Sequence, residues 1–219
     1  MSTGKLIIGN KRYSSWSLRG WLLVHLTGLE VTEEVIPLAG GVTAALRDAT
    51  PAGLVPYLEH GGARVWESLA IAEYCAEISP ALWPADRQAR ARARSIAAEM
   101  HSGFRALRMA MPMNLGRVLP GVGGSAECLA DIARVEAVWA ETRAGWGKGG
   151  SFLFGAAFGA ADAMFAPVVT RFLTYQPALS ASSQAYCEAV RAHPLVNRWY
   201  QEAAGEPAAW LLEKYENWA

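Results

Sequence analysis

Every strand-like segment of this 219-residue chain lies in its first third. Apolar and β-branched runs predict four strands and one Gly-Gly hairpin turn, at residues 5–9, at 31–36 and twice within 54–66 around Gly61-Gly62. Leucine spacing and capping residues predict three helices over residues 14–28, 42–49 and 68–78, the last with Ser68 as its N-cap. The predicted order is therefore strand, helix, strand, a short helix, two strands and a helix.

The pattern changes at a linker between Pro80 and Pro84, and no strand-like segment follows it. Asp86 is placed to cap one long helix with an apolar face that carries Ile96, Met100, Phe104, Leu107 and Met111. Ser125 is placed to cap another helix, and further helices are expected at residues 160–175, 183–193 and 195–204. The sequence therefore predicts an α/β domain over residues 1–83 and an all-helical domain over residues 84–219.

Composition argues against several function classes. The 20 Lys and Arg residues balance 20 Asp and Glu residues, whereas a nucleic-acid surface needs a basic excess. No run approaches the ~20 apolar residues that span a bilayer, and the N-terminus lacks the pattern of a signal peptide. The cysteines are too far apart for a metal site: Cys75, Cys128 and Cys187. We therefore expect a soluble cytoplasmic protein with buried thiols and no metal, nucleic-acid or membrane partner.

The loop that opens the first helix is the first candidate site. The predicted element order is that of a thioredoxin-type fold, in which a redox CxxC pair occupies this loop. Here the loop reads Ser14-Ser15-Trp16-Ser17, and serine hydroxyls cannot form a disulfide. A hydroxyl beside the free N–H groups of a helix N-terminus can bind an anion such as a thiolate, although helix capping is the simpler explanation of the serines when they are taken alone.

The energetics of thiolate binding at such a loop are favourable. Lowering a thiol pKa by two units takes roughly 2.7 kcal/mol. One hydrogen bond to a charged group supplies about 1.5–3 kcal/mol, and a helix N-terminus adds about 0.3–1 kcal/mol. A single hydroxyl at the helix start is therefore sufficient without a cationic neighbour.

Two further features lie at the ends of predicted strands. The Val55-Pro56 bond precedes a strand, where a cis proline would leave the Val55 backbone free to pair with a peptide ligand. Glu67-Ser68 opens a helix, so its carboxylate and hydroxyl suit the two ends of an α-amino acid. Each feature alone is also explained as a loop proline or a helix cap.

Taken together, these features resemble a cytosolic glutathione transferase along the whole chain. "SSWSLR" resembles the serine-type classes, which include zeta, theta, tau and phi, and "TPAGLVPYL" resembles the family's "NPLGKVPAL". "WESLAIAEY" resembles "TESLAIIEYL", and "FLFGAAFGAADAMFAPV" resembles the capping segment of the helical domain. The resemblance implies an N-terminal thioredoxin-like domain, an all-helical C-terminal domain, glutathione as co-substrate and a homodimer.

The resemblance also implies roles for individual residues. Ser14 would be catalytic by holding the glutathione thiolate, with Ser15 as the alternative and Ser17 as a helix residue. The residues expected to bind glutathione are Ser15, Trp16, Leu54, Val55, Pro56, Glu67 and Ser68. The expected wall of a pocket for a small hydrophobic electrophile includes Arg108, Met109 and Met113. Asp162 matches an acid that caps a helix and serves folding.

The chain departs from the family pattern at three positions. Leu54 stands where lysine is common, and Arg47 is a candidate substitute for that lysine. Gly159 replaces the usual capping Ser or Thr, and Trp16 replaces the cysteine of the zeta-class motif "SSCSWR". The main expectation is conjugation of glutathione to an electrophile. The alternatives are a glutathione-dependent isomerase of the maleylacetoacetate type, a peroxidase, or a non-catalytic glutathione-binding or regulatory module.

Overall fold

A computed structural model describes residues 4–218 of the chain. Four strands form one mixed sheet in the order β2-β1-β3-β4, with β1 parallel to β2 and antiparallel to β3. The strands are β1 (Gly4–Gly9), β2 (Val31–Ile36), β3 (Tyr57–His60) and β4 (Ala63–Trp66). The predicted Gly61-Gly62 hairpin joins β3 to β4, and both glycines have positive φ angles of 56° and 85°.

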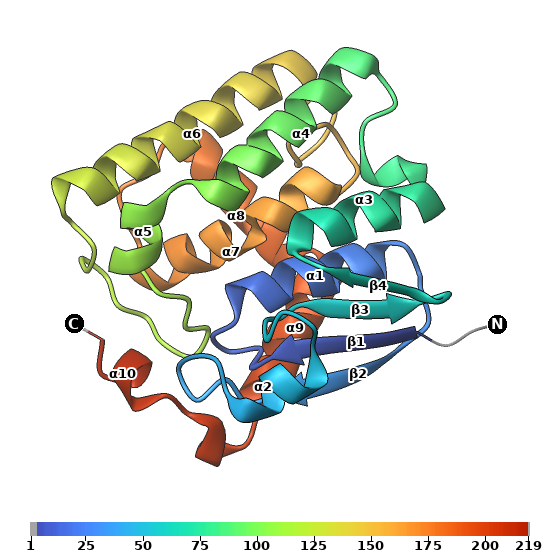
Figure 1. The fold of residues 1–219 in the computed structure, drawn as a ribbon. Helices are drawn as coiled ribbons and strands as arrows, with labels where there is room; N and C mark the ends of the chain where they lie inside the picture. Colours follow the sequence, from blue (N-terminus) through green and yellow to red (C-terminus); the bar gives the residue numbers. More distant parts are fainter. Residues whose placement is uncertain (1–3, 219) are drawn as a thin grey trace.

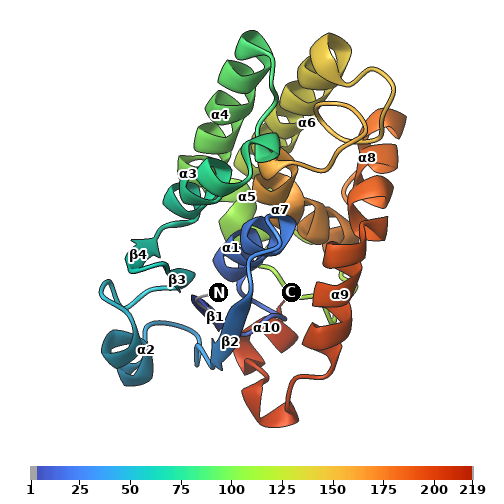
Figure 2. The same cartoon turned by 90° about the vertical axis from the view of Figure 1, so that its right-hand side faces the viewer.

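The two faces of the sheet are covered by different helices (Figures 1 and 2). The helices of this half are α1 (Ser15–Leu26), α2 (Ala44–Ala49) and α3 (Ser68–Ile78). Leu6 and Ile8 of β1 belong to the core cluster that contains α1 and α3, whereas Ile7 packs with Leu46 of α2 on the opposite face. Alternation along one buried strand thus builds a thioredoxin-like domain, as the sequence predicted.

The core of the second half is built from helices. They are α4 (Arg87–Ser102), α5 (Arg105–Ala110), α6 (Ala126–Trp146), α7 (Ala160–Tyr175), α8 (Ala181–Ala192) and α9 (Pro194–Ala204), with the short segments η1 (Pro80–Leu82), η2 (Ala208–Trp210) and α10 (Glu213–Glu216). Helix α7 is almost completely buried and contacts α1, α4 and α8. One continuous apolar core therefore joins both halves of the molecule.

The expectation of one long helix after Asp86 is wrong. Helix α4 ends at Ser102 and is capped by Gly103, which leaves no room for a side chain because a Cβ there would lie 2.8 Å from the Glu99 carbonyl oxygen. Phe104 then adopts a positive φ of 58° and starts the separate helix α5. The Leu107 N–H donates to the Asp131 carboxylate at 3.0 Å. The break turns α5 and carries Arg108 toward the α/β half.

Two smaller expectations concern helix ends and thiols. Ser68 is the first residue of α3 and not its N-cap, since Glu67 occupies the cap position without a side-chain hydrogen bond. The prediction of buried thiols is confirmed for Cys75, Cys128 and Cys187. Burial raises the pKa of Cys75 and of Cys187 to about 12.

No helix in the range 4–218 combines the length and apolar character needed to cross a membrane.

Candidate active site

Ser14 is the N-cap of α1 and is almost completely buried. Its Oγ accepts from the Ser17 N–H at 3.3 Å and donates to the Ser17 Oγ at 2.8 Å. The Ser17 Oγ in turn accepts from the Gly9 N–H at 2.8 Å, which ties the hydroxyl pair to the end of β1. Ser15 is half-buried and follows as the first helical residue. The structure therefore places Ser14 at the end of a hydrogen-bonded chain of two hydroxyls.

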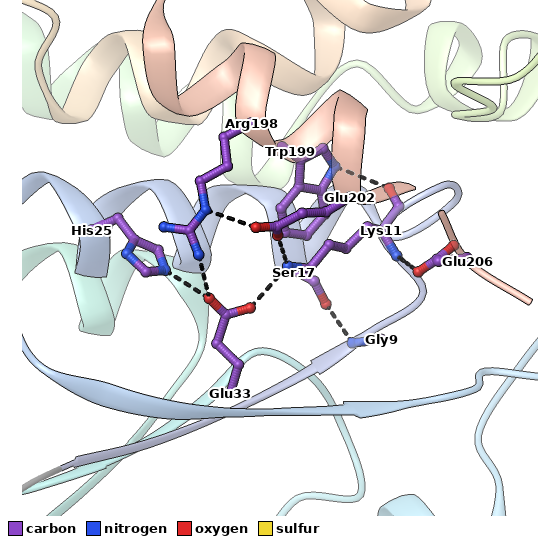
Figure 3. Close-up of polar contacts among 9 residues, drawn as sticks. All are labelled: Gly9, Lys11, Ser17, His25, Glu33, Arg198, Trp199, Glu202 and Glu206. Atoms are coloured by element: carbon purple, nitrogen blue, oxygen red, sulfur yellow. Dashed lines mark hydrogen bonds and ion pairs between the residues drawn. The ribbon is translucent and has the colours of Figure 1, made fainter. Parts of the chain in front are cut away.

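The loop before Ser14 is anchored by an ion-pair network that links β2 to α9 (Figure 3). The Lys11 ammonium lies 2.8 Å from Glu33 and also pairs with Glu202, while its backbone carbonyl accepts from the Trp199 indole at 2.9 Å. Burial alone would raise the pKa of Glu33, but hydrogen bonds from His25 and Lys11 lower it to about 2. The network holds the approach to Ser14 against the helical half.

Ser14 faces a cavity of about 330 Å³ between the two halves. Its lining comes from the α1 loop, the segment around α2, helix α5 with the loop after it, helix α7 and the C-terminal segment: Tyr13, Ser14, Ser15, Trp16, Leu38, Gly40, Gly41, Val42, Leu46, Leu54, Val55, Arg108, Pro112, Met113, Arg171, Leu212 and Tyr215. A second hollow of about 310 Å³ adjoins it and shares Trp16, Leu54 and Val55. Together they form a groove along the α/β half that ends beside Glu67.

The Val55-Pro56 bond is cis, as the sequence suggested. Pro56 packs directly on α1 at Gly20, where a Cβ would lie 2.6 Å from the proline ring. Because only glycine allows this approach, α1 and the segment before β3 meet closely. Leu54, Val55 and Pro56 all line the second hollow, so the predicted glutathione-binding segment lies on the groove.

Glu67 also lines the second hollow, and its backbone is strained. Its φ of 68° and ψ of 128° lie in a region that non-glycine residues rarely occupy, and such outliers concentrate at ligand sites. Neighbouring Ser68 is buried, with its Oγ 3.4 Å from the His101 Nδ1 atom. The His101 Nε2 atom lies 3.6 Å from the Glu67 carboxylate. The predicted pair is thus brought together, and His101 joins it from α4.

His101 was not predicted, because a single histidine on a helix carries no distinguishing pattern. Burial and the nearby Arg19 lower the pKa of His101, which favours the neutral ring. The ring also packs edge-on against Trp16, with centroids 5.1 Å apart. Trp16 lines both hollows, and its ring centroid lies 4.6 Å from the Arg19 guanidinium and 4.7 Å from that of Arg108.

The predicted electrophile wall is placed only in part. Arg108 and Met113 line the cavity, whereas Met109 is 64% exposed and does not line it. Arg47, the candidate substitute for the missing lysine, is exposed on α2 and is not among the lining residues. Sequence reasoning missed Arg171, which contributes to the wall from the buried helix α7.

The C-terminal segment closes one side of the cavity through Leu212 and Tyr215. Glu216 holds this segment in place by accepting from Arg12 at 3.1 and 3.0 Å and from the Tyr13 hydroxyl at 2.5 Å. The Asn114 amide adds a further donor at 3.0 Å. Burial disfavours the Glu216 carboxylate, but these donors outweigh it and lower its pKa.

Asp162 lies outside the groove at the start of α7. Its carboxylate accepts from the backbone N–H of Leu153 at 3.1 Å and of Gly159 at 3.0 Å, and from the Tyr186 hydroxyl at 2.9 Å. Burial outweighs these donors and raises the pKa of Asp162 to about 6. These contacts fit the predicted capping role.

Comparison with known proteins identifies the class of protein from both domains. A model of the glutathione S-transferase N-terminal domain matches residues 13–78, and a model of the C-terminal domain matches residues 85–202. The chain therefore belongs to the glutathione S-transferase family. A search of curated proteins found no match.

Solved structures show the same fold at low sequence identity. A glutathione transferase homolog from Burkholderia GL BGR1 with bound glutathione is 21% identical, with a TM-score of 0.71 over 94% of this chain and 100% of that chain. A bacterial zeta-class transferase, maleyl pyruvate isomerase, is 24% identical, with a TM-score of 0.70 over 93% and 99% of the two chains. A theta-class transferase from Xanthomonas axonopodis pv. citri with glutathione bound is 22% identical, with a TM-score of 0.67 over 91% and 98%.

Proposed function

We propose that this protein conjugates glutathione to a small electrophile and that Ser14 holds the reacting thiolate. The observation that carries the proposal is the position of the Ser14 hydroxyl, at the N-terminus of α1 and on the wall of the cavity. Glutathione would lie along the groove, with the cysteinyl backbone at Val55 and the γ-glutamyl end at Glu67 and Ser68. Two of the structural neighbours carry bound glutathione, which supports the same ligand here.

The hydroxyl pair of Ser14 and Ser17 explains how Ser14 can donate a hydrogen bond to the sulfur and remain hydrogen-bonded to Ser17. With the site as it stands, Ser14 donates to Ser17. When a thiolate binds, the Ser14 proton turns to the sulfur, and the Ser17 hydroxyl can donate to the Ser14 Oγ in its place. The Gly9 N–H still donates to Ser17, so the chain of donors points at the sulfur and each bond polarises the next.

The chemical step needs little more than an activated sulfur held against the electrophile. The thiol loses its proton to solvent, and the sulfur attacks the electrophilic carbon to form a C–S bond. A leaving group departs with the bonding electrons, or the adduct takes up a proton after addition to a double bond. Proximity in the cavity and thiolate stabilisation together provide the rate enhancement. Such a protein would act in detoxification as a cytoplasmic homodimer.

The alternatives differ in what happens to glutathione. An isomerase returns glutathione unchanged, a peroxidase yields glutathione disulfide, and a non-catalytic module binds glutathione without turnover. The groove carries the Ser14 hydroxyl, the cis Val55-Pro56 bond and the Glu67 side chain, which favours an enzyme over a module.

Calorimetry with glutathione, followed by mass spectrometry of reaction mixtures, tests the proposal. We expect saturable binding of glutathione and a conjugate whose formation consumes one glutathione per electrophile. Absence of glutathione binding would refute the proposal, and turnover without net loss of glutathione would support the isomerase instead. The matched control is Met109→Ala, which changes an exposed neighbour of Arg108 outside the cavity.

A further inference from the structure

The cavity beside Ser14 is lined by two guanidinium groups and by no carboxylate from the range 4–218. Arg108 reaches it from α5 and Arg171 from α7, although the two residues are far apart in the sequence. Arg171 is 6% exposed, so its charge lies almost entirely out of bulk water. A third arginine, Arg19, is 1% exposed and packs against the Trp16 ring.

The hydrogen bonds of the three arginines leave their charges uncompensated. Arg108 donates to the His101 carbonyl at 2.9 Å, and Arg171 donates to the carbonyls of Met111 at 2.7 Å and Pro167 at 2.9 Å. The Arg19 Nε donates to the Met164 carbonyl at 3.0 Å, while its Nη1 has no partner in the described part of the chain. None of the three forms an ion pair with an Asp or Glu of residues 4–218.

Such a cluster is unfavourable on its own and favours an incoming anion. Arginine keeps its proton in proteins, so burial does not neutralise these groups. Burial lowers the pKa of all three, and repulsion from neighbouring arginines adds to this in Arg19 and in Arg171, whose pKa falls to about 10. A buried charge is ordinarily paired, and a guanidinium pairs most strongly with a carboxylate through two parallel hydrogen bonds. The missing partner is therefore expected from the ligand.

We propose that the electrophile carries a carboxylate, which binds Arg108 and Arg171 while its reactive carbon meets the sulfur beside Ser14. The inference rests on the proposed transferase function, in which the glutathione γ-glutamyl end is assigned to the opposite end of the groove at Glu67. Pro112, Met113, Leu212 and Tyr215 line the same cavity and accommodate the apolar body of the molecule. The expected small hydrophobic electrophile thus becomes an amphipathic one with an acidic end.

Two product-like conjugates test this without requiring turnover. S-(para-carboxybenzyl)glutathione and S-(para-carbamoylbenzyl)glutathione have nearly the same shape and differ by one negative charge. Calorimetry on the full-length protein should show the carboxylate binding about 10- to 100-fold more tightly, as one or two charge-assisted hydrogen bonds provide. Arg108→Gln should collapse this ratio toward one. The matched control Arg105→Gln removes the same charge from an exposed position of α5 and should leave the ratio unchanged.

The outcomes separate this inference from the function on which it rests. Equal affinity of the wild-type protein for both conjugates overturns the inference while leaving glutathione transfer intact. An equal loss for both conjugates in Arg108→Gln, together with a raised thiol pKa of bound glutathione, also overturns it, because Arg108 would then act on the sulfur. Failure of glutathione itself to bind refutes the proposed function. Circular dichroism of Arg108→Gln should match the wild type, because Arg108 is only half-buried.

Discussion

Replacing Glu67 by glycine is expected to change stability and ligand affinity in opposite directions. The residue has a φ of 68°, and holding a non-glycine residue in such a conformation costs about 1–3 kcal/mol. Glycine relieves that strain but costs ~0.5–1 kcal/mol through the freedom it adds to the unfolded chain. Glu67→Ala is the matched variant, because it loses the same contact with His101 and keeps the strain. We therefore expect Glu67→Gly to be about 1 kcal/mol more stable than Glu67→Ala.

Both variants lose the carboxylate that would hold the glutathione ammonium, so both should bind glutathione about 10- to 150-fold more weakly. Urea unfolding gives the stability difference, and calorimetry gives the affinities. If the glycine variant is less stable than the alanine variant, the backbone is not strained at this position. If both variants bind glutathione like the wild type, the strain at Glu67 serves something other than this ligand.

Three further outcomes follow from the other contacts. Asp162 has a folded pKa of about 6 against an ordinary 3.8. The protonated side chain therefore stabilises the fold below pH ~4, and this contribution is lost as the pH rises through 6. The stability advantage of the wild type over Asp162→Asn in urea unfolding should shrink by up to about 3 kcal/mol between pH 4 and 7, and a constant difference would contradict the assignment. Glu216→Gln should speed hydrogen exchange in residues 211–218 about ten-fold without changing the melting temperature. The exposed control Glu213→Gln should leave the exchange rates unchanged. Ser17→Ala leaves the Gly9 N–H buried without its partner, so the free energy of unfolding should fall by about 1–3 kcal/mol in a thermal melt. An unchanged melting temperature would refute the hydrogen-bonded chain of hydroxyls.

The features that sequence reasoning predicted are those set by local patterns. The apolar run placed a strand at residues 5–9, and the Gly61-Gly62 pair placed the hairpin, because short strands and tight turns depend on a few adjacent residues. The thioredoxin-like and helical domains followed from the change in periodicity after residue 80.

The features that it missed depend on contacts between distant segments. Apolar spacing continued through Gly103 and Phe104, so the break between α4 and α5 was hidden until packing against Asp131 was known. Arg171 looked like one polar residue in an apolar helix, and nothing nearby indicated that it reaches the same cavity as Arg108. Tyr215 likewise lies in the cavity wall because the next residue, Glu216, pairs with Arg12, which is about two hundred positions earlier in the chain.

The central claim is that the Ser14 hydroxyl lowers the thiol pKa of bound glutathione, and a titration of thiolate absorbance against pH tests it most directly. In the wild-type protein we expect a thiol pKa about two units below the free value of ~8.5. Ser14→Ala should return it to within about half a unit of the free value, whereas Ser15→Ala should leave it low, because one hydrogen bond to the charged sulfur accounts for most of the shift. Identical titrations of the wild-type and Ser14→Ala proteins, with glutathione bound to both, would contradict the account.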